Sequence, residues 1–276
     1  MITRTFSHIA GVGKEFEKKL WAQGILSWAA FIKHNHPNTK RISAIKNALL
    51  DSFFALESGN HHFFSASLPS SEHWRLFKEF SKCTAYVDIE TTGLSPDYCE
   101  ITTIALYDGK EIKYYINGKN LYEFLKDIRQ YDLLVTFNGK GFDVPFIQQY
   151  FGIELKQSHI DLRYVLASLG FSGGLKACEK AFGLARNELE GVDGRMAVYL
   201  WTEYKKGKKS ALDTLLAYNI EDVINLEYLM YTAYNLKIKE LGLGDALLEV
   251  PTRPMVQFKA DSKLISKLKA KYFPEW

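Results

Sequence analysis

The chain has 276 residues, of which 47% are hydrophobic and 14% aromatic, a composition that indicates an ordered globular protein and excludes a disordered or fibrous one. Its 35 basic and 32 acidic residues give a net charge of only +3, which excludes a strongly basic nucleic-acid coat protein. The three cysteines are widely spaced, no export signal is evident, and no run of eighteen apolar residues occurs, so we expect a cytoplasmic protein without a zinc knuckle or membrane span.

The N-terminal region, residues 1–57, is predicted to be helical because large apolar side chains recur at near-helical spacing between Phe16 and Ile32. A Gly-Val-Gly turn formed by Gly11 to Gly13 interrupts this pattern and resembles the helix-hairpin-helix motif. Such a turn holds a nucleic-acid phosphate through backbone N–H groups, which makes both glycines candidate phosphate-binding residues. The equally open alternative is that they only permit a tight turn between helices.

The connector that follows is rich in Gly, Pro, Ser and Asn and ends in a short helix, together occupying residues 58–81. Beyond it, β-rich runs predict strands, and helical patterns dominate after the last of them to about residue 236. The strands are expected at residues 84–89, 100–106, 111–116 and 133–137, with a helix at 121–129. This succession indicates an α/β sheet within residues 82–236.

Lysines gather in three places despite the small net charge. They lie within residues 33–46, within residues 205–209, and in a basic tail that we assign to residues 237–276. Each cluster by itself is typical of a solvated helix face. Together they could follow a phosphate backbone.

The first motif that indicates chemistry lies at the end of the first expected strand. Alternation along a strand places Asp88 and Glu90 on one face. Neighbouring carboxylates repel each other and a divalent cation relieves that repulsion, so this pair is a candidate metal site. Thr91, Gly93 and Leu94 follow in a turn suited to substrate contact. The alternative is an acidic strand end exposed to solvent.

A second motif follows the strand at residues 133–137. Asp143 is expected at the start of a helix, where exposed backbone N–H groups favour a carboxylate. Taken alone, this residue is most simply explained as an N-cap.

The third motif, residues 216–226, has helical periodicity with its apolar side chains directed inward. Tyr218 and Asp222 are four residues apart and therefore share one helix face. A phenol beside a metal-ligating carboxylate can hydrogen-bond the water that attacks a phosphorus. Taken alone, the pair is more simply an interfacial aromatic residue and a surface charge.

The three motifs together follow the order and approximate spacing of the DEDD exonuclease superfamily over residues 82–235. The chain resembles the DEDDy branch, to which proofreading exonuclease domains belong, and is most similar to the YprB-type ribonuclease-H-like family. That closer resemblance extends upstream through residues 8–13 and 64–69. Position by position, it implies catalytic, metal-ligating acids at Asp88, Glu90, Asp143 and Asp222, with the catalytic Tyr218 as the tyrosine of Tyr-x-x-x-Asp.

The resemblance implies a ribonuclease-H-like mixed sheet flanked by helices, with a small helix-hairpin-helix-like N-terminal region. It also implies a 3′→5′ exonuclease that acts on DNA or RNA with a free 3′ end and releases nucleoside 5′-monophosphates. The four acids would hold two divalent ions, Mg²⁺ or Mn²⁺. Many YprB-type members carry histidine where this chain has Tyr218, so the chemistry around the ligands differs within the family.

Further substrate contacts are expected around the acids. Asn138 is a candidate contact to the phosphate backbone, and Leu94, Phe142 and Phe146 are candidates for stacking on a terminal nucleotide, with core packing as their alternative. Asp161 is a further acid near the site, which we interpret as structural.

Two other functions stay open. One is a structure-specific endonuclease, and the other is a non-catalytic nucleic-acid-binding module on the same fold. The retained acids argue against the module, and product length distinguishes an endonuclease. The histidines show no His-x-x-x-His spacing, which disfavours a zinc hydrolase.

Overall fold

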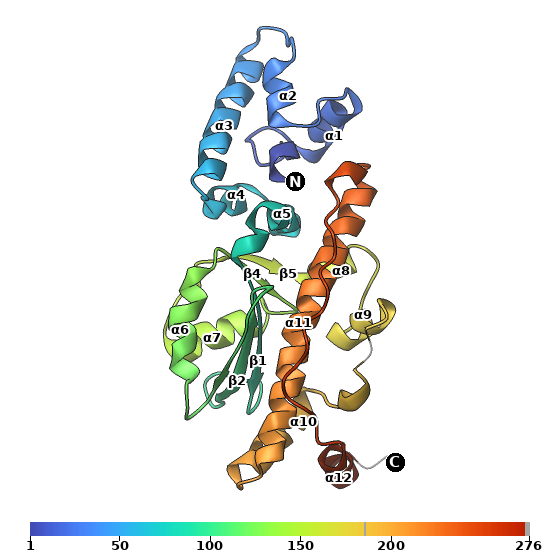
Figure 1. Ribbon diagram of the computed structural model, residues 1–276. Coiled ribbons are helices and arrows are strands. Elements are labelled where there is room, and N and C mark those ends of the chain that lie inside the picture. The colour runs from blue at the N-terminus through green and yellow to red at the C-terminus, as the bar shows by residue number, and fades with distance from the viewer. Residues whose placement is uncertain (185, 274–276) are drawn as a thin grey trace.

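The computed structural model describes residues 1–184 and 186–273. Within this part of the chain, five strands form one sheet in the order β3-β2-β1-β4-β5 (Figure 1). The three strands β3, β2 and β1 pair antiparallel, whereas β1, β4 and β5 run parallel. Their bounds are β1 (Thr84–Thr91), β2 (Ile101–Tyr107), β3 (Ile112–Ile116), β4 (Leu133–Thr136) and β5 (Ser158–Asp161). The expected mixed sheet is therefore confirmed.

One strand differs from the expectation. The helical patterns anticipated after residue 137 do not cover Ser158–Asp161, which pairs with β4 as the edge strand β5. A four-residue strand with the sequence Ser-His-Ile-Asp carries too little alternation to be recognised. Its pairing with β4, rather than its own propensity, makes it a strand.

Helices precede, flank and follow the sheet. The N-terminal and connector helices are α1 (Lys14–Ala22), α2 (Trp28–Lys33), α3 (Lys40–Glu57), α4 (His61–Ser67), a 3₁₀ helix η2 (Ser70–Leu76) and α5 (Phe77–Phe80). Those around the sheet are α6 (Phe124–Asp127), α7 (Asp143–Phe151), α8 (Leu162–Ala167), α9 (Leu175–Ala181), α10 (Gly194–Lys205), α11 (Lys209–Glu240) and α12 (Ser262–Tyr272). The expected helix at 121–129 is observed as α6 between two 3₁₀ turns, spanning Leu121 to Gln130.

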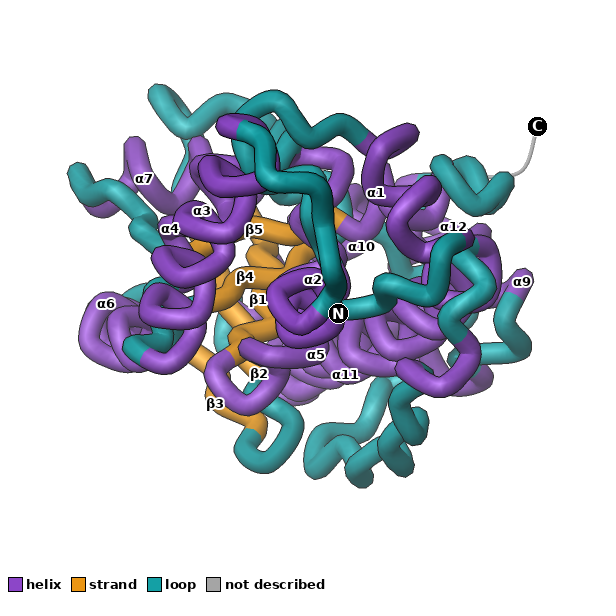
Figure 2. Tube along the Cα trace, turned by 90° about the horizontal axis from the view of Figure 1, so that it is seen from above, coloured by secondary structure: helices purple, strands orange, loops and turns teal. Residues whose placement is uncertain are grey.

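Successive side chains of β1 point to opposite faces of the sheet and therefore pack in two different cores. Ala85, Val87 and Ile89 belong to the core beneath α6 and α7, whereas Tyr86 belongs to the core shared with α11. Figures 1 and 2 show α6 and α7 on one side of the sheet and α11 on the other. Side chains two and four residues beyond Tyr86 therefore face α11.

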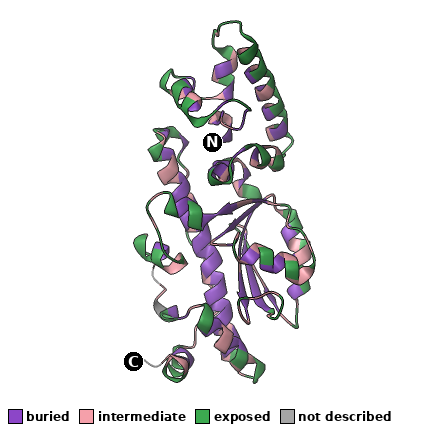
Figure 3. Cartoon of the chain, turned by 180° about the vertical axis from the view of Figure 1, so that it is seen from behind, coloured by how far each residue is buried: buried purple, intermediate pink, exposed green. Residues whose placement is uncertain are grey.

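The long helix α11 is the main partner of the sheet. It has 32 residues, and buried side chains occur along most of its length (Figure 3). A helix enclosed on most sides has little amphipathic contrast, which explains how polar residues come to lie inside this one. It packs on β1 and β2 and ends before Gly242, whose φ of +72° provides a left-handed stop.

The N-terminal helices have their own aromatic cluster. Trp28 packs against Phe53 and Phe64 with ring centroids 5.2 Å and 6.0 Å away. The connector contacts α11, where the rings of Trp74 and Tyr234 are 5.9 Å apart. The connector therefore joins the helical region to the sheet region.

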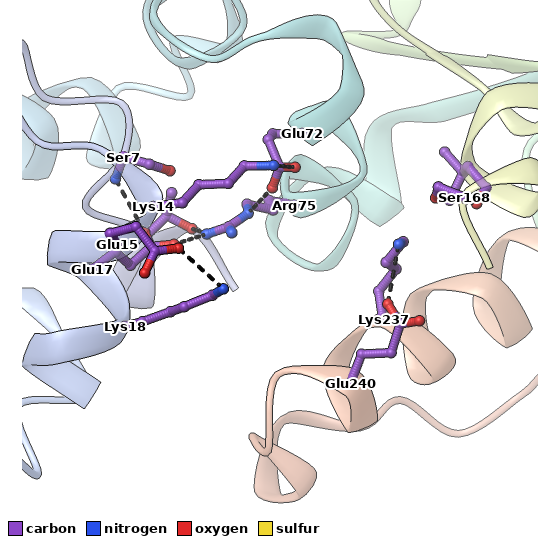
Figure 4. Close-up of polar contacts among 12 residues, drawn as sticks. Ser7, Lys14, Glu15, Glu17, Lys18, Glu72, Arg75, Ser168, Lys237 and Glu240 are labelled. Atoms are coloured by element: carbon purple, nitrogen blue, oxygen red, sulfur yellow. Dashed lines mark hydrogen bonds and ion pairs between the residues drawn. The ribbon is translucent and has the colours of Figure 1, made fainter. Parts of the chain in front are cut away.

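A buried ion-pair network ties α1 to η2. Arg75 donates from Nη1 to Glu17 Oε1 at 2.8 Å and from Nε to Glu72 Oε2 at 2.6 Å (Figure 4). Lys14 pairs with Glu72 from the solvent side. Because Arg75 and Glu17 are almost fully buried, removing either partner would leave a charge without compensation.

The C-terminal segment returns along α11 to α12, near the α10 end of the molecule (Figure 1). There the rings of Tyr199 and Tyr272 stack with centroids 3.8 Å apart. None of the described helices combines the length and apolar character needed to cross a membrane.

Candidate active site

Carboxylates from one strand and one helix meet at a single place. Asp88 and Glu90 lie on β1 and face α11, which carries Asp222. One carboxylate oxygen from each of the three lies within 4.8 Å of the others. The β1–β2 register shifts between Glu90 and Thr91, and such bulges re-aim side chains beside active sites. The structure thus brings the first and third motifs together.

Asp143 reaches the same place from α7, where it is the first residue as expected. Its Oδ1 accepts a hydrogen bond from Ile89 N at 3.2 Å, which ties α7 to β1. Among the described residues, the group of carboxylates within 4.8 Å of one another does not include Asp143. This side chain therefore braces the strand that carries the acidic pair.

The acids are costly to ionise where they lie. Burial, followed by the charge of Asp222, raises the pKa of both Asp88 and Glu90 well above their ordinary values. Burial also raises the pKa of Asp143 and of Asp222, although in Asp222 the neighbouring Arg186 opposes the rise. A cation bound between these groups would offset both effects.

Asn219 holds Asp88 in place. Its Nδ2 donates to Asp88 Oδ2 at 2.7 Å, and its Oδ1 accepts from Thr103 Oγ1 at 3.0 Å. Asn219 is completely buried. Sequence reasoning missed this residue, although an amide directly after Tyr218 in an otherwise apolar helix face was a usable signal.

Tyr218 shares a helix face with Asp222, as its spacing predicts, and is only 7% exposed. Burial, followed by the charge of Asp222, raises the pKa of the phenol well above its ordinary value. Lys176 Nζ lies 4.9 Å from the centre of the ring. The phenol therefore stays protonated, and its ring lies beside the ammonium group of Lys176.

The acids and Tyr218 line one cavity of about 600 Å³ together with the expected substrate contacts. These expected contacts are Thr91, Gly93, Leu94, Asn138 and Phe142. Lys176 and Arg195 also line it and were not predicted. Each is the second residue of its helix, one or two positions after a glycine, and only the fold places it beside the acids.

The loop after β4 shapes one wall of this cavity. Asp161 accepts hydrogen bonds from Asn138 N at 2.7 Å and Lys140 N at 3.0 Å, and it also caps α8 through Arg163 N. Asn138 has a positive φ of 64°. The structural interpretation of Asp161 agrees with these contacts, since it holds a strained turn in place.

The three aromatic and aliphatic stacking candidates differ in exposure. Leu94 is 86% exposed at the cavity, and Phe142 is partly buried there. Phe146 is 1% exposed and belongs to the core beneath α7. Only Leu94 and Phe142 are therefore placed to contact a ligand.

The Gly11 to Gly13 turn lies apart from this cavity, among the N-terminal helices. Gly11 has a φ of +77°, and the extended Gly13 is the N-cap of α1. Neither position would bring an added Cβ within 4 Å of another atom. The turn is therefore open, but it does not line the cavity that contains the acids.

The donor set suits a hard divalent cation. The buried carboxylates of Glu90 and Asp222 converge with the partly buried carboxylate of Asp88. Asp222 Oδ1 is enclosed without a hydrogen-bond donor among the described residues, although it forms an ion pair with Arg186. Carboxylate oxygens are the ligands that Mg²⁺ and Mn²⁺ prefer. The residues present therefore fit such ions.

Parts of this chain are similar to known proteins. A similar protein, DNA polymerase 1 of Aeropyrum pernix, is 28% identical over 180 residues, which are 58% of this chain and 19% of the polymerase. The structure of the family B DNA polymerase from the hyperthermophilic archaeon Pyrobaculum calidifontis matches 64% of this chain and 31% of that chain, with 14% identity and a TM-score of 0.38. Residues 85–234, which hold the sheet and all four acids, match the family model described as the RNase_H superfamily. The chain therefore belongs to the RNase_H superfamily and has its ribonuclease-H-like fold.

Proposed function

We propose that the protein is a metal-dependent 3′→5′ exonuclease that hydrolyses phosphodiester bonds of nucleic acids and releases nucleoside 5′-monophosphates. The observation that carries the proposal is the meeting of Asp88 and Glu90 with Tyr218 and Asp222 in a cavity that Asp143 also lines. Membership of the RNase_H superfamily and the similarity to a DNA polymerase support a polynucleotide substrate.

The four acids would hold two Mg²⁺ or Mn²⁺ ions. Bound there, the ions would supply charge stabilisation for the attacking water and the leaving 3′ oxygen. Asn219 keeps the Asp88 carboxylate directed at the site through its 2.7 Å hydrogen bond. The chain contributes neighbouring carboxylates whose mutual repulsion a bound cation would relieve, which favours cation binding.

Tyr218 orients the attacking water. Its phenol stays protonated because its pKa is raised, so it acts as a hydrogen-bonding group rather than as a base. Lys176 lines the cavity, and its Nζ lies 4.9 Å from the centre of the Tyr218 ring. It is available to a phosphate oxygen, since it forms no ion pair with another described residue. These two side chains would position the nucleophile and the scissile phosphate.

The cavity accommodates a small ligand such as one terminal nucleotide, because about 600 Å³ lies within the usual range for small-molecule sites. Leu94 and Phe142 would contact the base, and Thr91, Gly93 and Asn138 would contact the sugar and phosphate. A pocket of this size favours removal of single nucleotides from an end.

The test uses single-stranded DNA and RNA labelled at either end, incubated with Mg²⁺, Mn²⁺ or EDTA. We expect 3′-labelled strands to release a labelled mononucleotide at once and 5′-labelled strands to shorten stepwise. Internal cuts would instead support the endonuclease, and binding without cleavage would support the non-catalytic module. Activity that persists in EDTA would contradict the metal dependence.

A further inference from the structure

An arginine outside the sequence motifs is in contact with the last acid of the site. Arg186 forms an ion pair with Asp222 Oδ1 through Nη2, and its side chain is only 7% exposed. The same guanidinium donates from Nε to Glu179 Oε2 at 2.7 Å. One buried cation therefore bridges the site acid and a second acid on α9.

The second acid is itself held by α11. Asn225 Nδ2 donates to Glu179 Oε1 at 2.7 Å, and Asn225 follows Asp222 by three residues on the helix. The network therefore connects Asp222 through Arg186 and Glu179 to Asn225, which lies one turn further along α11. Such a closed loop restricts the orientation of every group in it.

Stability alone explains this network poorly. Buried ion pairs are weak evidence for stabilisation because desolvation opposes the attraction. Arg186 Nη1 is also buried without a hydrogen-bond partner among the residues that the structure describes, which costs further stability. Arg186 lies 5.5 Å from the centre of the Tyr218 ring as well, so its contacts converge on the two functional groups of α11.

We propose that Arg186 is a positioning residue that orients the Asp222 carboxylate toward Asp88 and Glu90 and supports the Tyr218 ring. This inference rests on the proposed metal-dependent function. Glu179 neutralises the guanidinium, so the pair adds little net charge beside the cation site. The planar fork of arginine serves two carboxylates at once, which a lysine ammonium does not reproduce.

The test compares Mn²⁺ affinity by calorimetry in the full chain, with folding checked by circular dichroism. Loss of a group that orients a metal ligand typically costs 10-fold to 100-fold in affinity, and we expect a rise of roughly that size in the Mn²⁺ Kd of Arg186→Gln. Arg186→Lys keeps a buried cation and should fold even if Arg186→Gln does not. It should show a smaller loss of affinity, together with a reduced kcat at little-changed KM.

The matched control is Arg253→Gln, because Arg253 pairs with Glu221, the neighbour of Asp222 on α11. Its Mn²⁺ affinity should equal that of the wild type. Unchanged affinity in both folded Arg186 variants would overturn the positioning role. Tighter binding would also overturn it, because Arg186 would then be a cation that competes with the metal.

The wild-type protein and Asp88→Asn separate this inference from the proposed function. Mn²⁺ binding by the wild type that is lost in Asp88→Asn supports the metal site, whatever the Arg186 variants do. Absence of Mn²⁺ binding in the wild type would overturn both proposals.

Discussion

Asn219 donates a hydrogen bond to Asp88 at 2.7 Å from a position between Tyr218 and Asp222 on α11. The same side chain accepts a hydrogen bond from Thr103 on β2. One buried amide therefore sets the distance between the strand acids and the helix that completes the site.

Asn219→Ala should reduce both activity and stability. The change removes the donor to Asp88 and the acceptor for Thr103, and unsatisfied buried groups cost about 1–3 kcal/mol of unfolding free energy. Urea unfolding and nucleotide release measure the two effects. Thr103→Val is the matched control, because it breaks only the other hydrogen bond and should lower stability while leaving activity nearly intact. Equal activity loss in both variants would contradict a specific role at Asp88.

Asp88→Asn should abolish nucleotide release and leave the metal-free protein as stable as the wild type or more so. Asp88 is partly buried and lies beside other carboxylates that raise its pKa, so removing its charge relieves repulsion. Differential scanning fluorimetry in EDTA measures the stability, with the exposed Asp51→Asn as the reference. Retained activity in a folded Asp88→Asn protein would refute the site assignment.

Asp222→Asn should also abolish activity, but without the gain in stability. Asp222 is paired with Arg186, and neutralising Asp222 removes one of the two carboxylates that compensate this buried guanidinium, Glu179 being the other. The comparison of the two melting temperatures in EDTA tests this difference. A larger increase for Asp222→Asn than for Asp88→Asn would show that the ion pair does not stabilise the metal-free site.

Tyr218→Phe should lower turnover by roughly 10²-fold while Mn²⁺ binding stays nearly intact, because only the hydroxyl that orients water is removed. Calorimetry and steady-state kinetics give the two quantities. Joint loss of binding and activity would mean that the hydroxyl organises the ligands instead.

Gly13→Val tests the N-terminal turn better than a deletion does. Deleting α1 would strip the buried Arg75 of its partner Glu17, whereas a Cβ at Gly13 meets no atom within 4 Å. If the turn binds phosphate, affinity for long strands should fall, and the slope of log K against log salt should flatten by about 0.7 to 0.9 per lost contact. Gly244→Val, at another open glycine, is the control. Unaltered affinity and slope would leave the glycines with the structural role only.

Acid should destabilise the N-terminal helices through His8. Burial lowers the pKa of His8 from 6.5 to about 4, so the unfolded chain takes up its proton first as the pH falls. The stability that the neutral ring contributes is therefore complete above about pH 6.5 and is lost between there and pH 4, a change of roughly 3 kcal/mol. In urea unfolding, His8→Gln should lack this part of the acid dependence, whereas the exposed His34→Gln should keep it. Identical pH dependence in His8→Gln and wild type would rule the effect out.

Local patterns in the sequence determined much of this protein. Strand alternation placed Asp88 and Glu90 on one face, and helical spacing placed Tyr218 with Asp222, because both periodicities are properties of the backbone alone. The strands β1 to β4 and an α/β sheet followed from the same regularities. The family resemblance linked the motifs, and the matching family model supports its superfamily level.

Tertiary structure decided the features that no local pattern encodes. The strand β5 exists because β4 offers it hydrogen bonds, and Lys176 reaches the cavity because the segment around α9 packs beside α11. Glu179 and Arg186 became recognisable only through their partners, since a buried polar side chain is defined by what satisfies it. The sequence therefore specified which acids face the same way, and packing specified which neighbours hold them there.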